Sequence, residues 1–188
     1  MNTVEISLKI LKELEDSLKS INPKEVEKLV DTISSSKKIF VAGAGRSRLM
    51  MLGLAMRLMQ LGFRAYVVGE TVTPAIGSRD LLIIGSGSGE TGTMKAIAKN
   101  AKKAGAKLAL ITIYPDSSIG RLANLVIQIS AATSKVKNGE GIKSFQPGAN
   151  TFEQSLLLIC DTVAIRLIEK LNILDANEIL MKYHANLE

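Results

Sequence analysis

Three short polar segments of this chain hold the groups best suited to chemistry. Ser86-Gly87-Ser88-Gly89-Glu90-Thr91 places three hydroxyls around two glycines, and Gly43-Ala44-Gly45-Arg46-Ser47 is a second glycine-containing turn. The third segment, Thr151-Phe152-Glu153-Gln154, supplies a carboxylate. Hydroxyls and unpaired backbone N–H groups donate hydrogen bonds to anionic oxygens. The two glycine turns therefore indicate a phosphorylated ligand, and the carboxylate is a candidate general base.

Both glycine turns are expected to join a strand to a helix. Each follows a short run rich in β-branched residues and precedes a segment with helical periodicity. At the start of a helix several backbone N–H groups lack partners, and the helix dipole adds partial positive charge. The two turns thus predict one phosphorylated ligand held from two sides. A purely structural turn with a serine cap is the alternative for the longer one.

The longer turn is predicted to bind the ligand through Ser86, Gly87, Ser88, Gly89, Glu90 and Thr91. Its hydroxyls are donors, and its glycines let the backbone approach a phosphate closely. A hydrogen bond to a charged oxygen contributes roughly 1.5–3 kcal/mol, so several of them hold a phosphate without a lysine. Because the carboxylate of Glu90 repels phosphate, its side chain is expected to face away, toward sugar hydroxyls or a neighbouring chain.

The shorter turn allows two interpretations. It begins like the dinucleotide-binding fingerprint, but Arg48 stands where the third glycine belongs. Glu70 follows the second predicted strand, where a ribose-binding acid would lie, so nucleotide binding is an alternative that leaves the longer turn unexplained. In the other interpretation Arg46 and Ser47 contact sugar or phosphate oxygens. A surface ion pair is the alternative role of Arg46.

Glu153 lies at the predicted start of a long helix. Thr151 and Gln154 have the spacing of a capping box, which puts Glu153 in the first turn. A carboxylate there complements the helix dipole without any further function, and the residues alone favour that interpretation. The only histidine, His184, lies in the C-terminal tail, where surface exposure is expected. Neither a metal-ligand cluster nor a Ser-His-acid arrangement is recognisable, so no metal site is predicted.

Five apolar runs predict the scaffold that positions these groups, with strands at 38–42, 65–68, 81–84, 108–112 and 126–129. The runs do not alternate, and helical or turn segments separate them, which is typical of a parallel sheet covered on both faces. We expect an α/β fold, a three-layer α/β/α sandwich of the flavodoxin type. Its strand order 2-1-3-4-5 would place both glycine turns side by side at the switch point.

The 188 residues suit a single domain. Its expected parts are N-terminal helices over 1–36, a sheet core over 37–130, a long irregular loop over 131–150 and C-terminal helices over 151–188. Residues 4–20 read as an amphipathic helix with Val4, Leu8 and Leu11 on one stripe. The helix that runs to about Gln60 is apolar on nearly every side. Either a partner subunit or the chain's own N-terminal helices must cover it, and the first case makes the protein a homo-oligomer.

Composition excludes several classes of protein. A net charge of +6 favours anionic ligands, but the absence of Trp, the 4% aromatic content and the scattered lysines argue against nucleic acid as a partner. No signal peptide is visible, and no apolar run is long enough to cross a membrane. The single cysteine, Cys160, cannot form an internal disulfide and is expected to be buried in a helix. A cytoplasmic location is therefore expected.

The combination of motifs resembles the 6-phospho-3-hexuloisomerases of the sugar isomerase (SIS) domain superfamily. The resemblance covers almost the whole chain, because it extends from the three polar segments to Ala55–Met59, Val68–Thr71 and His184–Leu187. Two positions depart from the family pattern. Arg48 stands where such proteins often have glycine, and Pro147-Gly148-Ala149 replaces a more usual Pro-Met-Gly.

The resemblance implies a five-stranded parallel sheet flanked by helices, often assembled as a homotetramer. It also implies an isomerase that interconverts D-arabino-hex-3-ulose 6-phosphate and D-fructose 6-phosphate, in the ribulose monophosphate pathway of formaldehyde fixation. Ser47 and Ser86–Thr91 would bind the phosphorylated hexulose, Glu153 would accept the proton, and His184 would contribute from another subunit. One carboxylate can move the proton through an enediol, with Arg46 as a donor to the enediolate oxygen. No cofactor is expected.

Two further functions remain as alternatives. The same superfamily supplies ligand-sensing domains to transcriptional regulators, so a non-catalytic sugar-phosphate sensor is one of them. The short N-terminal region has no helix-turn-helix signature, which argues against DNA binding. The other alternative is an isomerase of a different phosphosugar, such as arabinose 5-phosphate or sedoheptulose 7-phosphate.

Overall fold

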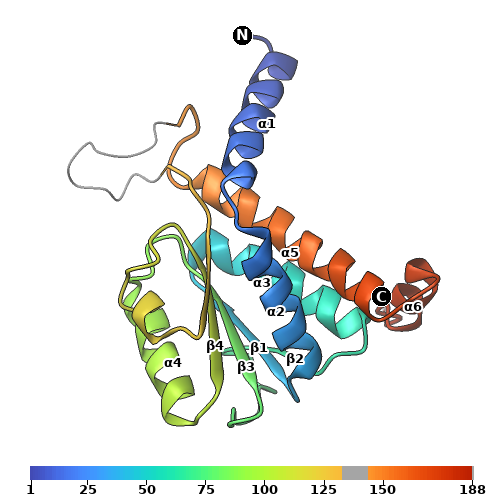
Figure 1. The fold of residues 1–188 in the computed structure, drawn as a ribbon. Helices are drawn as coiled ribbons and strands as arrows, with labels where there is room; N and C mark the ends of the chain where they lie inside the picture. Colours follow the sequence, from blue (N-terminus) through green and yellow to red (C-terminus); the bar gives the residue numbers. More distant parts are fainter. Residues whose placement is uncertain (133–143, 188) are drawn as a thin grey trace.

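Five parallel strands form the central layer of the molecule (Figure 1). This computed structural model describes residues 1–132 and 144–187. The strands are β1 (Ile39–Gly43), β2 (Ala65–Val67), β3 (Leu81–Gly85), β4 (Lys107–Thr112) and β5 (Leu125–Gln128). Their order is β2-β1-β3-β4-β5, and every neighbouring pair is parallel. The predicted strand order is confirmed, and the predicted boundaries are correct to within a residue or two.

Helices cover both faces of this sheet. One face carries α2 (Pro23–Ser35), α3 (Gly45–Gln60) and α5 (Asn150–Lys170), against which α1 (Thr3–Lys19) and α6 (Ala176–Lys182) pack. The other face carries α4 (Gly92–Lys103) and the 3₁₀ helix η1 (Gly120–Leu122). Successive strand residues point to opposite faces, so Val41 and Ile83 join the first core while Ala42 and Ile84 join the second. The fold is the predicted three-layer α/β/α sandwich.

The ends of β1 and β3 lie side by side. Gly43 is paired with Gly85 at the last position of the two strands. The chain leaves β1 through α3 toward β2, and it leaves β3 through α4 toward β4, on the opposite face. A Cβ on Gly85 would lie 2.8 Å from the Met51 sulfur, so glycine is what lets α3 approach β3 this closely. Both glycine turns therefore open from one switch point of the sheet.

Helix α3 is covered by the C-terminal helix α5 rather than by the N-terminal helices. It packs along α5 and β1, and α6 contacts its far end, whereas α1 and α2 lie against α5. Its outer residues Leu49, Met56 and Met59 remain exposed. The expectation that the chain's own N-terminal helices cover α3 is therefore wrong, and cover of its outer side by a partner subunit stays a prediction.

The first turns of α1 stand clear of the rest of the molecule (Figure 1). Only Leu14 and Ser17 of this helix are buried. Val4, Leu8 and Leu11, the stripe that gives the helix its amphipathic pattern, are 66%, 59% and 58% exposed. Their apolar surface therefore has no cover within the described residues.

Two further findings concern the described residues as a whole. None of their helices is both apolar enough and long enough to cross a membrane. Part of the loop predicted over 131–150, residues 133–143, lies outside the described part of the chain. On either side of it, Ser130 and Ser144 belong to irregular segments that lead from β5 and into α5.

Candidate active site

A cavity of about 370 Å³ opens at the carboxyl edge of the sheet, beyond the ends of β1 and β3. It brings together all three polar segments that the sequence singled out. Its lining residues are Ala44, Gly45, Arg46, Ser47, Gly85, Ser86, Gly87, Ser88, Thr91, Gly148, Ala149, Phe152 and Glu153. The side-by-side strand ends thus bring donors from two turns and a carboxylate from α5 to one cavity.

Three helices begin at this cavity, and all three lack a side-chain cap. The N-cap residues of α3, α4 and α5 are Ala44, Thr91 and Ala149, and none of them accepts a hydrogen bond from its helix through its side chain. The helices α1, α2 and α6, which begin elsewhere, each have an Asn or Asp cap that does so. Uncapped helix starts leave unpaired N–H donors and the positive end of the dipole for an anion.

The longer turn keeps donors available on its cavity side. The Ser86 hydroxyl oxygen accepts from the N–H of Gly89 at 3.2 Å, and the Ser88 hydroxyl oxygen accepts from the N–H of Glu90 at 3.2 Å. Each hydroxyl therefore has its own hydrogen left to donate. In the described part of the chain, the backbone N–H groups of Gly87, Ser88 and Thr91 have no hydrogen-bond acceptor. These groups suit an anion of several oxygens.

Gly89 and Glu90, which the sequence predicted to bind the ligand, are not among the residues that line the cavity. The Glu90 carboxylate faces away, as predicted, but its partners are in its own chain. It accepts from the Ser118 N–H at 2.6 Å and the Ser118 hydroxyl at 2.8 Å, and it pairs with Lys95 at 3.2 Å. These contacts, the Ser118 N–H first, lower the pKa of Glu90 to about 2. Gly89 has a φ of 59° and no room for a side chain beside Ser117. Both residues therefore support the turn on the side that faces away from the cavity.

Glu153 enters the cavity from the first turn of α5, as predicted. One of its carboxylate oxygens lies 3.3 Å from Nη1 of Arg46, and the two side chains are 14% and 43% exposed. The same Arg46 nitrogen donates to the side-chain oxygen of Asn150. The two roles considered for Arg46, an ion pair and a place in the site, are thus compatible: the pair lies at the cavity itself.

The predicted capping box of α5 is wrong. The helix begins at Asn150, one residue early, and its N-cap is Ala149. The Thr151 hydroxyl instead donates to Glu13 of α1, and the side-chain oxygen of Gln154 is buried with no partner among the described residues. A tertiary contact has replaced the local one, and sequence spacing carries no signal for it.

The shorter glycine turn, at 43–47, does not have beside it in the cavity the acidic side chain that nucleotide binding would need. Glu70 pairs with Arg48 at 2.5 Å, and neither residue lines the cavity. The third glycine position of the fingerprint is thus filled by an arginine that holds the predicted ribose-binding acid outside the site. Ser47, in the first turn of α3, does line the cavity.

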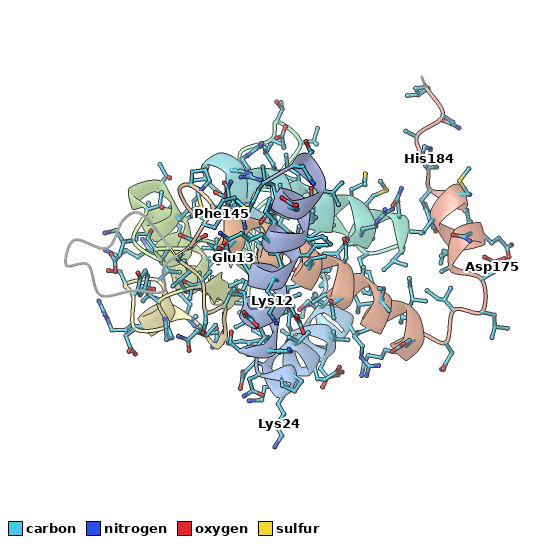
Figure 2. All side chains as sticks on the ribbon, turned by 90° about the horizontal axis from the view of Figure 1, so that it is seen from above. Lys12, Glu13, Lys24, Phe145, Asp175 and His184 are labelled. Atoms are coloured by element: carbon cyan, nitrogen blue, oxygen red, sulfur yellow. The ribbon has the colours of Figure 1, made fainter. Side chains whose placement is uncertain are left out.

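His184 does not lie at the cavity of its own chain. It follows α6, which contacts the far end of α3, and it is exposed with its Nδ1 3.0 Å from the carbonyl oxygen of Ala185. Figure 2 shows it far from Glu13 and Phe145, which lie beside the start of α5. Helix α5 has 21 residues, so its two ends are about 30 Å apart. Any part of His184 in the site must therefore concern another copy of the chain.

Two observations bear on other chemistries. Within the described ranges no three His, Cys, Asp or Glu side chains gather as metal ligands would. Cys160 is buried in α5, as predicted, and burial raises the pKa of its thiol to about 12. A thiol of that pKa is not ionised near neutral pH and is a poor nucleophile.

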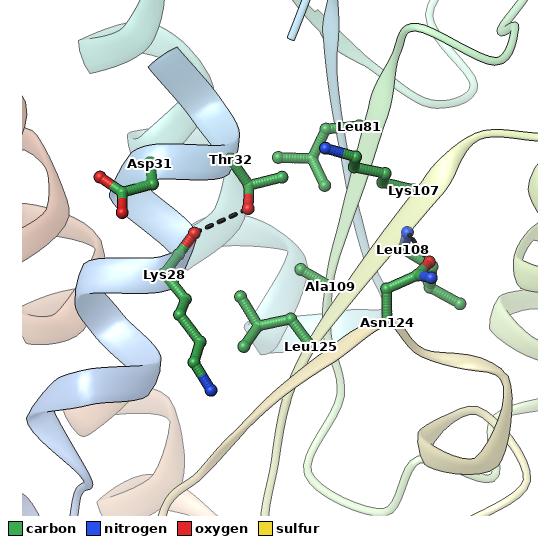
Figure 3. A pocket seen from close by; sticks show the side chains of 9 residues that line it. All are labelled: Lys28, Asp31, Thr32, Leu81, Lys107, Leu108, Ala109, Asn124 and Leu125. Carbon is green, nitrogen blue, oxygen red and sulfur yellow. Dashed lines mark hydrogen bonds between the residues drawn. The ribbon is translucent and has the colours of Figure 1, made fainter. Parts of the chain in front are cut away.

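A second cavity of about 320 Å³ lies at the opposite edge of the sheet (Figure 3). Its walls come from α2 and from the amino ends of the strands, where Leu81 begins β3 and Lys107 begins β4. The Thr32 hydroxyl already donates to the carbonyl of Lys28 at 2.7 Å. No residue that the sequence singled out for chemistry lines this cavity, so the candidate site is the one at the carboxyl edge.

Comparison with known proteins gives consistent matches. A family model of the SIS domain matches residues 32–158. The chain is 45% identical over 188 residues, all of both chains, to the 3-hexulose-6-phosphate isomerase of Bacillus subtilis (strain 168). It is 41% identical over 176 residues, covering 94% of this chain and 86% of the relative, to the protein of the same name from Mycobacterium gastri.

A solved structure agrees with these matches. The crystal structure of the hypothetical protein MJ1247 from Methanococcus jannaschii, for which the function of a 3-hexulose-6-phosphate isomerase has been inferred, superposes with a TM-score of 0.84. The two chains are 32% identical, and the match covers 98% of this chain and 99% of the other.

Proposed function

The chain belongs to the SIS domain family, and from this premise we propose that it is a 3-hexulose-6-phosphate isomerase. Such an enzyme interconverts D-arabino-hex-3-ulose 6-phosphate and D-fructose 6-phosphate. Full-length relatives of that name support the assignment. The observation that carries it is structural: one cavity holds uncapped helix starts and hydroxyls on one side and the carboxylate of Glu153 on the other.

The phosphate of the substrate lies, in this proposal, against the longer turn. The hydroxyls of Ser86, Ser88 and Thr91 and the N–H groups around Gly87 donate to its oxygens, and Ser47 donates from the start of α3. These hydrogen bonds hold the phosphate on carbon 6, several bonds away from the reacting carbons 2 and 3. Its binding energy therefore orients the carbonyl end of the hexulose toward Glu153.

Isomerisation moves a carbonyl between adjacent carbons. In the direction of fructose 6-phosphate, Glu153 removes the proton from carbon 2 of the hexulose, and the electron pair of that C–H bond forms the 2,3-enediolate. The carbonyl oxygen at carbon 3 takes up the proton that the hydroxyl at carbon 2 releases, so the substrate gains and loses no net proton. The same carboxylic acid then returns its proton to carbon 3 as the hydroxyl at carbon 2 becomes the carbonyl. Arg46, 3.3 Å from Glu153, stabilises the negative charge of the enediolate.

We also propose an assembly and a setting for this enzyme. The exposed apolar residues of α1 and α3, such as Leu8 and Met56, support a homo-oligomer, and the family resemblance favours a homotetramer. In that assembly His184 reaches the cavity of a neighbouring subunit. The enzyme acts in the cytoplasm, in the ribulose monophosphate pathway of formaldehyde fixation, where its substrate is consumed.

A panel of phosphosugars tests the proposal. Wild-type protein is mixed separately with D-arabino-hex-3-ulose 6-phosphate, arabinose 5-phosphate and sedoheptulose 7-phosphate, and each mixture is followed by ¹³C and ³¹P NMR. We expect fructose 6-phosphate to form from the first sugar and no turnover of the other two. Turnover of another sugar alone would reassign the substrate. Binding of a sugar phosphate without any turnover would indicate the non-catalytic sensor.

A further inference from the structure

Glu13 of α1 reaches the chain segment that leads into α5 (Figure 2). One carboxylate oxygen accepts from the Phe145 N–H at 2.6 Å. The other accepts from the Ser144 hydroxyl at 2.7 Å, the Thr151 hydroxyl at 3.2 Å and the Gln146 side-chain amide at 3.4 Å. A single carboxylate therefore gathers four donors from both sides of the turn at 147–150.

The four contacts lie in a partly enclosed place. Gln146 and Thr151 are only 7% and 5% exposed, so their polar groups depend on a partner inside the protein. Burial alone raises the pKa of Glu13, but the hydrogen bonds of its four donors, the Phe145 N–H first among them, together lower it below the ordinary value. The Glu13 carboxylate is thus an ionised hydrogen-bond acceptor in the folded protein. No neutral side chain would accept these four hydrogen bonds equally well.

Helix α1 is itself held firmly at this point. The Ser17 hydroxyl donates to the Ser130 carbonyl at 2.8 Å and is bonded to the Ser155 hydroxyl at 3.2 Å. The Lys9 ammonium lies 4.2 Å from the centre of the Phe145 ring, one helical turn before Glu13. Glu13 therefore acts from a part of α1 that is fixed against α5 and against the segment that follows β5.

The segment that Glu13 holds forms one wall of the candidate active site. Gly148 and Ala149, between its contacts at Gln146 and Thr151, line the cavity. Glu153 follows Thr151 by two residues, and its N–H donates to the Ala149 carbonyl at 3.1 Å. A shift of this turn therefore moves the proposed base, and a misplacement of about 1 Å can lower the rate about 10²-fold.

We propose that Glu13 is a positioning residue, which holds Gly148, Ala149 and Glu153 in place opposite the phosphate-binding turn. This inference rests on the proposed isomerase function. Glu13 does not line the cavity, so it acts on the reaction only through the segment that it binds. The substrate's phosphate is held by other elements, so the effect falls on the chemical step rather than on binding.

The test compares Glu13→Gln and Glu13→Ala with Glu15→Gln. Glu15 is an exposed carboxylate of the same helix whose partners are Lys12 and Lys19. The amide of the Gln variant keeps one acceptor oxygen, so we expect kcat to fall about tenfold in Glu13→Gln and about 10²-fold in Glu13→Ala. KM for D-arabino-hex-3-ulose 6-phosphate should stay within about threefold of wild type, and Glu15→Gln should match wild type in both constants.

A second measurement keeps the test independent of global stability. Hydrogen exchange of the Phe145 amide, whose acceptor is Glu13, should become faster in both Glu13 variants at an unchanged exchange rate of the β3 core amides. An unchanged kcat in Glu13→Ala would overturn the proposal, and so would a fall in kcat accompanied by loss of protection throughout the core. Absence of isomerase activity in the wild-type protein would instead overturn the proposed function, and this inference with it.

Discussion

Two oppositely charged side chains define the chemistry of the cavity at the scale of residues. Arg46 comes from the start of α3 and Glu153 from the start of α5, and the two helices pack along each other. Their 3.3 Å separation is therefore fixed by helix packing rather than by a flexible loop. In the proposed reaction, the Arg46 cation beside Glu153 stabilises the charge that develops on the substrate oxygen as the proton leaves.

Removing that cation should slow the reaction. We expect Arg46→Ala to lower kcat about 10²-fold, the usual cost of losing one group that stabilises an oxyanion. Arg48→Ala is the matched control, because Arg48 lies two residues further along α3 but pairs with Glu70 outside the cavity. Steady-state kinetics of both variants decide the point, and equal losses of kcat would contradict the assignment of Arg46.

The hydroxyl of Ser88 should matter for binding rather than for turnover. Loss of one hydrogen bond to a charged oxygen costs roughly 1.5–3 kcal/mol, so Ser88→Ala should raise the inhibition constant of a phosphorylated sugar about 10- to 100-fold. Ser35→Ala is the control, because the Ser35 hydroxyl bonds only to carbonyls of its own helix. An unchanged inhibition constant in Ser88→Ala would place the phosphate elsewhere.

Single residues were predictable where a local pattern determines them and not where a distant contact does. Ser47, Ser86 and Ser88 line the cavity because glycine turns after adjacent strands leave few other arrangements. Thr151 matched a local capping pattern, but its hydroxyl donates to Glu13, 138 residues away in the sequence. No spacing rule reaches across such a separation.

At the scale of elements, the turn at Ser86–Thr91 depends on its connection to the residues that precede η1. The Glu90 carboxylate accepts hydrogen bonds from both the N–H and the hydroxyl of Ser118. The Ile119 N–H donates to the Gly89 carbonyl at 3.2 Å. The segment after β4 therefore supports this turn on the side away from the cavity. The sequence alone did not identify Ser118 as the partner of Glu90, because no sequence pattern around Ser118 indicates a contact with this turn.

This connection should depend on pH. The pKa of Glu90 is lowered from 4.5 to about 2 in the folded protein, first by the Ser118 N–H. A lowered folded-state pKa stabilises the protein fully above the unfolded value, and that contribution is lost as the pH falls through the folded value. Glu90→Gln should thus melt at a lower temperature than wild type at pH 7. The difference should narrow as the pH falls from 4.5 toward 2.

Thermal unfolding between pH 7 and the acid range checks this. Ser118→Ala is the companion variant, because it removes the hydroxyl donor and leaves the backbone N–H in place. Its melting temperature should fall between those of wild type and Glu90→Gln at pH 7. A constant difference between wild type and Glu90→Gln at every pH would show that the carboxylate charge has no part in holding the turn.

The arrangement of elements was largely predictable. Apolar runs without alternation gave a parallel sheet, and a switch point between β1 and β3 is the arrangement that brings two ligand-binding turns together. The cover of α3 was not predicted, because α1, α2 and α5 all present apolar faces in the sequence and no local pattern assigns one of them to α3. Tertiary packing makes that choice.

At the scale of the whole molecule, exposed apolar surface marks where copies of the chain should meet. Val4, Leu8 and Leu11 form a row on the free side of α1, and Met56 and Met59 remain exposed on α3. Large uncovered apolar side chains in such numbers are typical of an interaction surface. The amphipathic pattern of α1 could be read from sequence, but not which molecule covers its apolar side.

A charge placed in that row should weaken assembly. We expect Leu8→Asp to sediment as a smaller species than wild type, because a carboxylate buried at an apolar interface lacks a partner. Lys24→Asp, at an exposed position at the start of α2, is the control. Sedimentation velocity at matched concentrations measures both. Identical sedimentation of Leu8→Asp and wild type would remove α1 from the interface.

One measurement addresses the central claim most directly: the rate at which wild type and Glu153→Gln convert D-arabino-hex-3-ulose 6-phosphate, with binding of the sugar phosphate followed in parallel by ³¹P NMR. We predict that wild type forms fructose 6-phosphate, and that Glu153→Gln binds the phosphate equally well but turns it over roughly 10²–10⁴-fold more slowly. Near-normal turnover by Glu153→Gln would contradict the account.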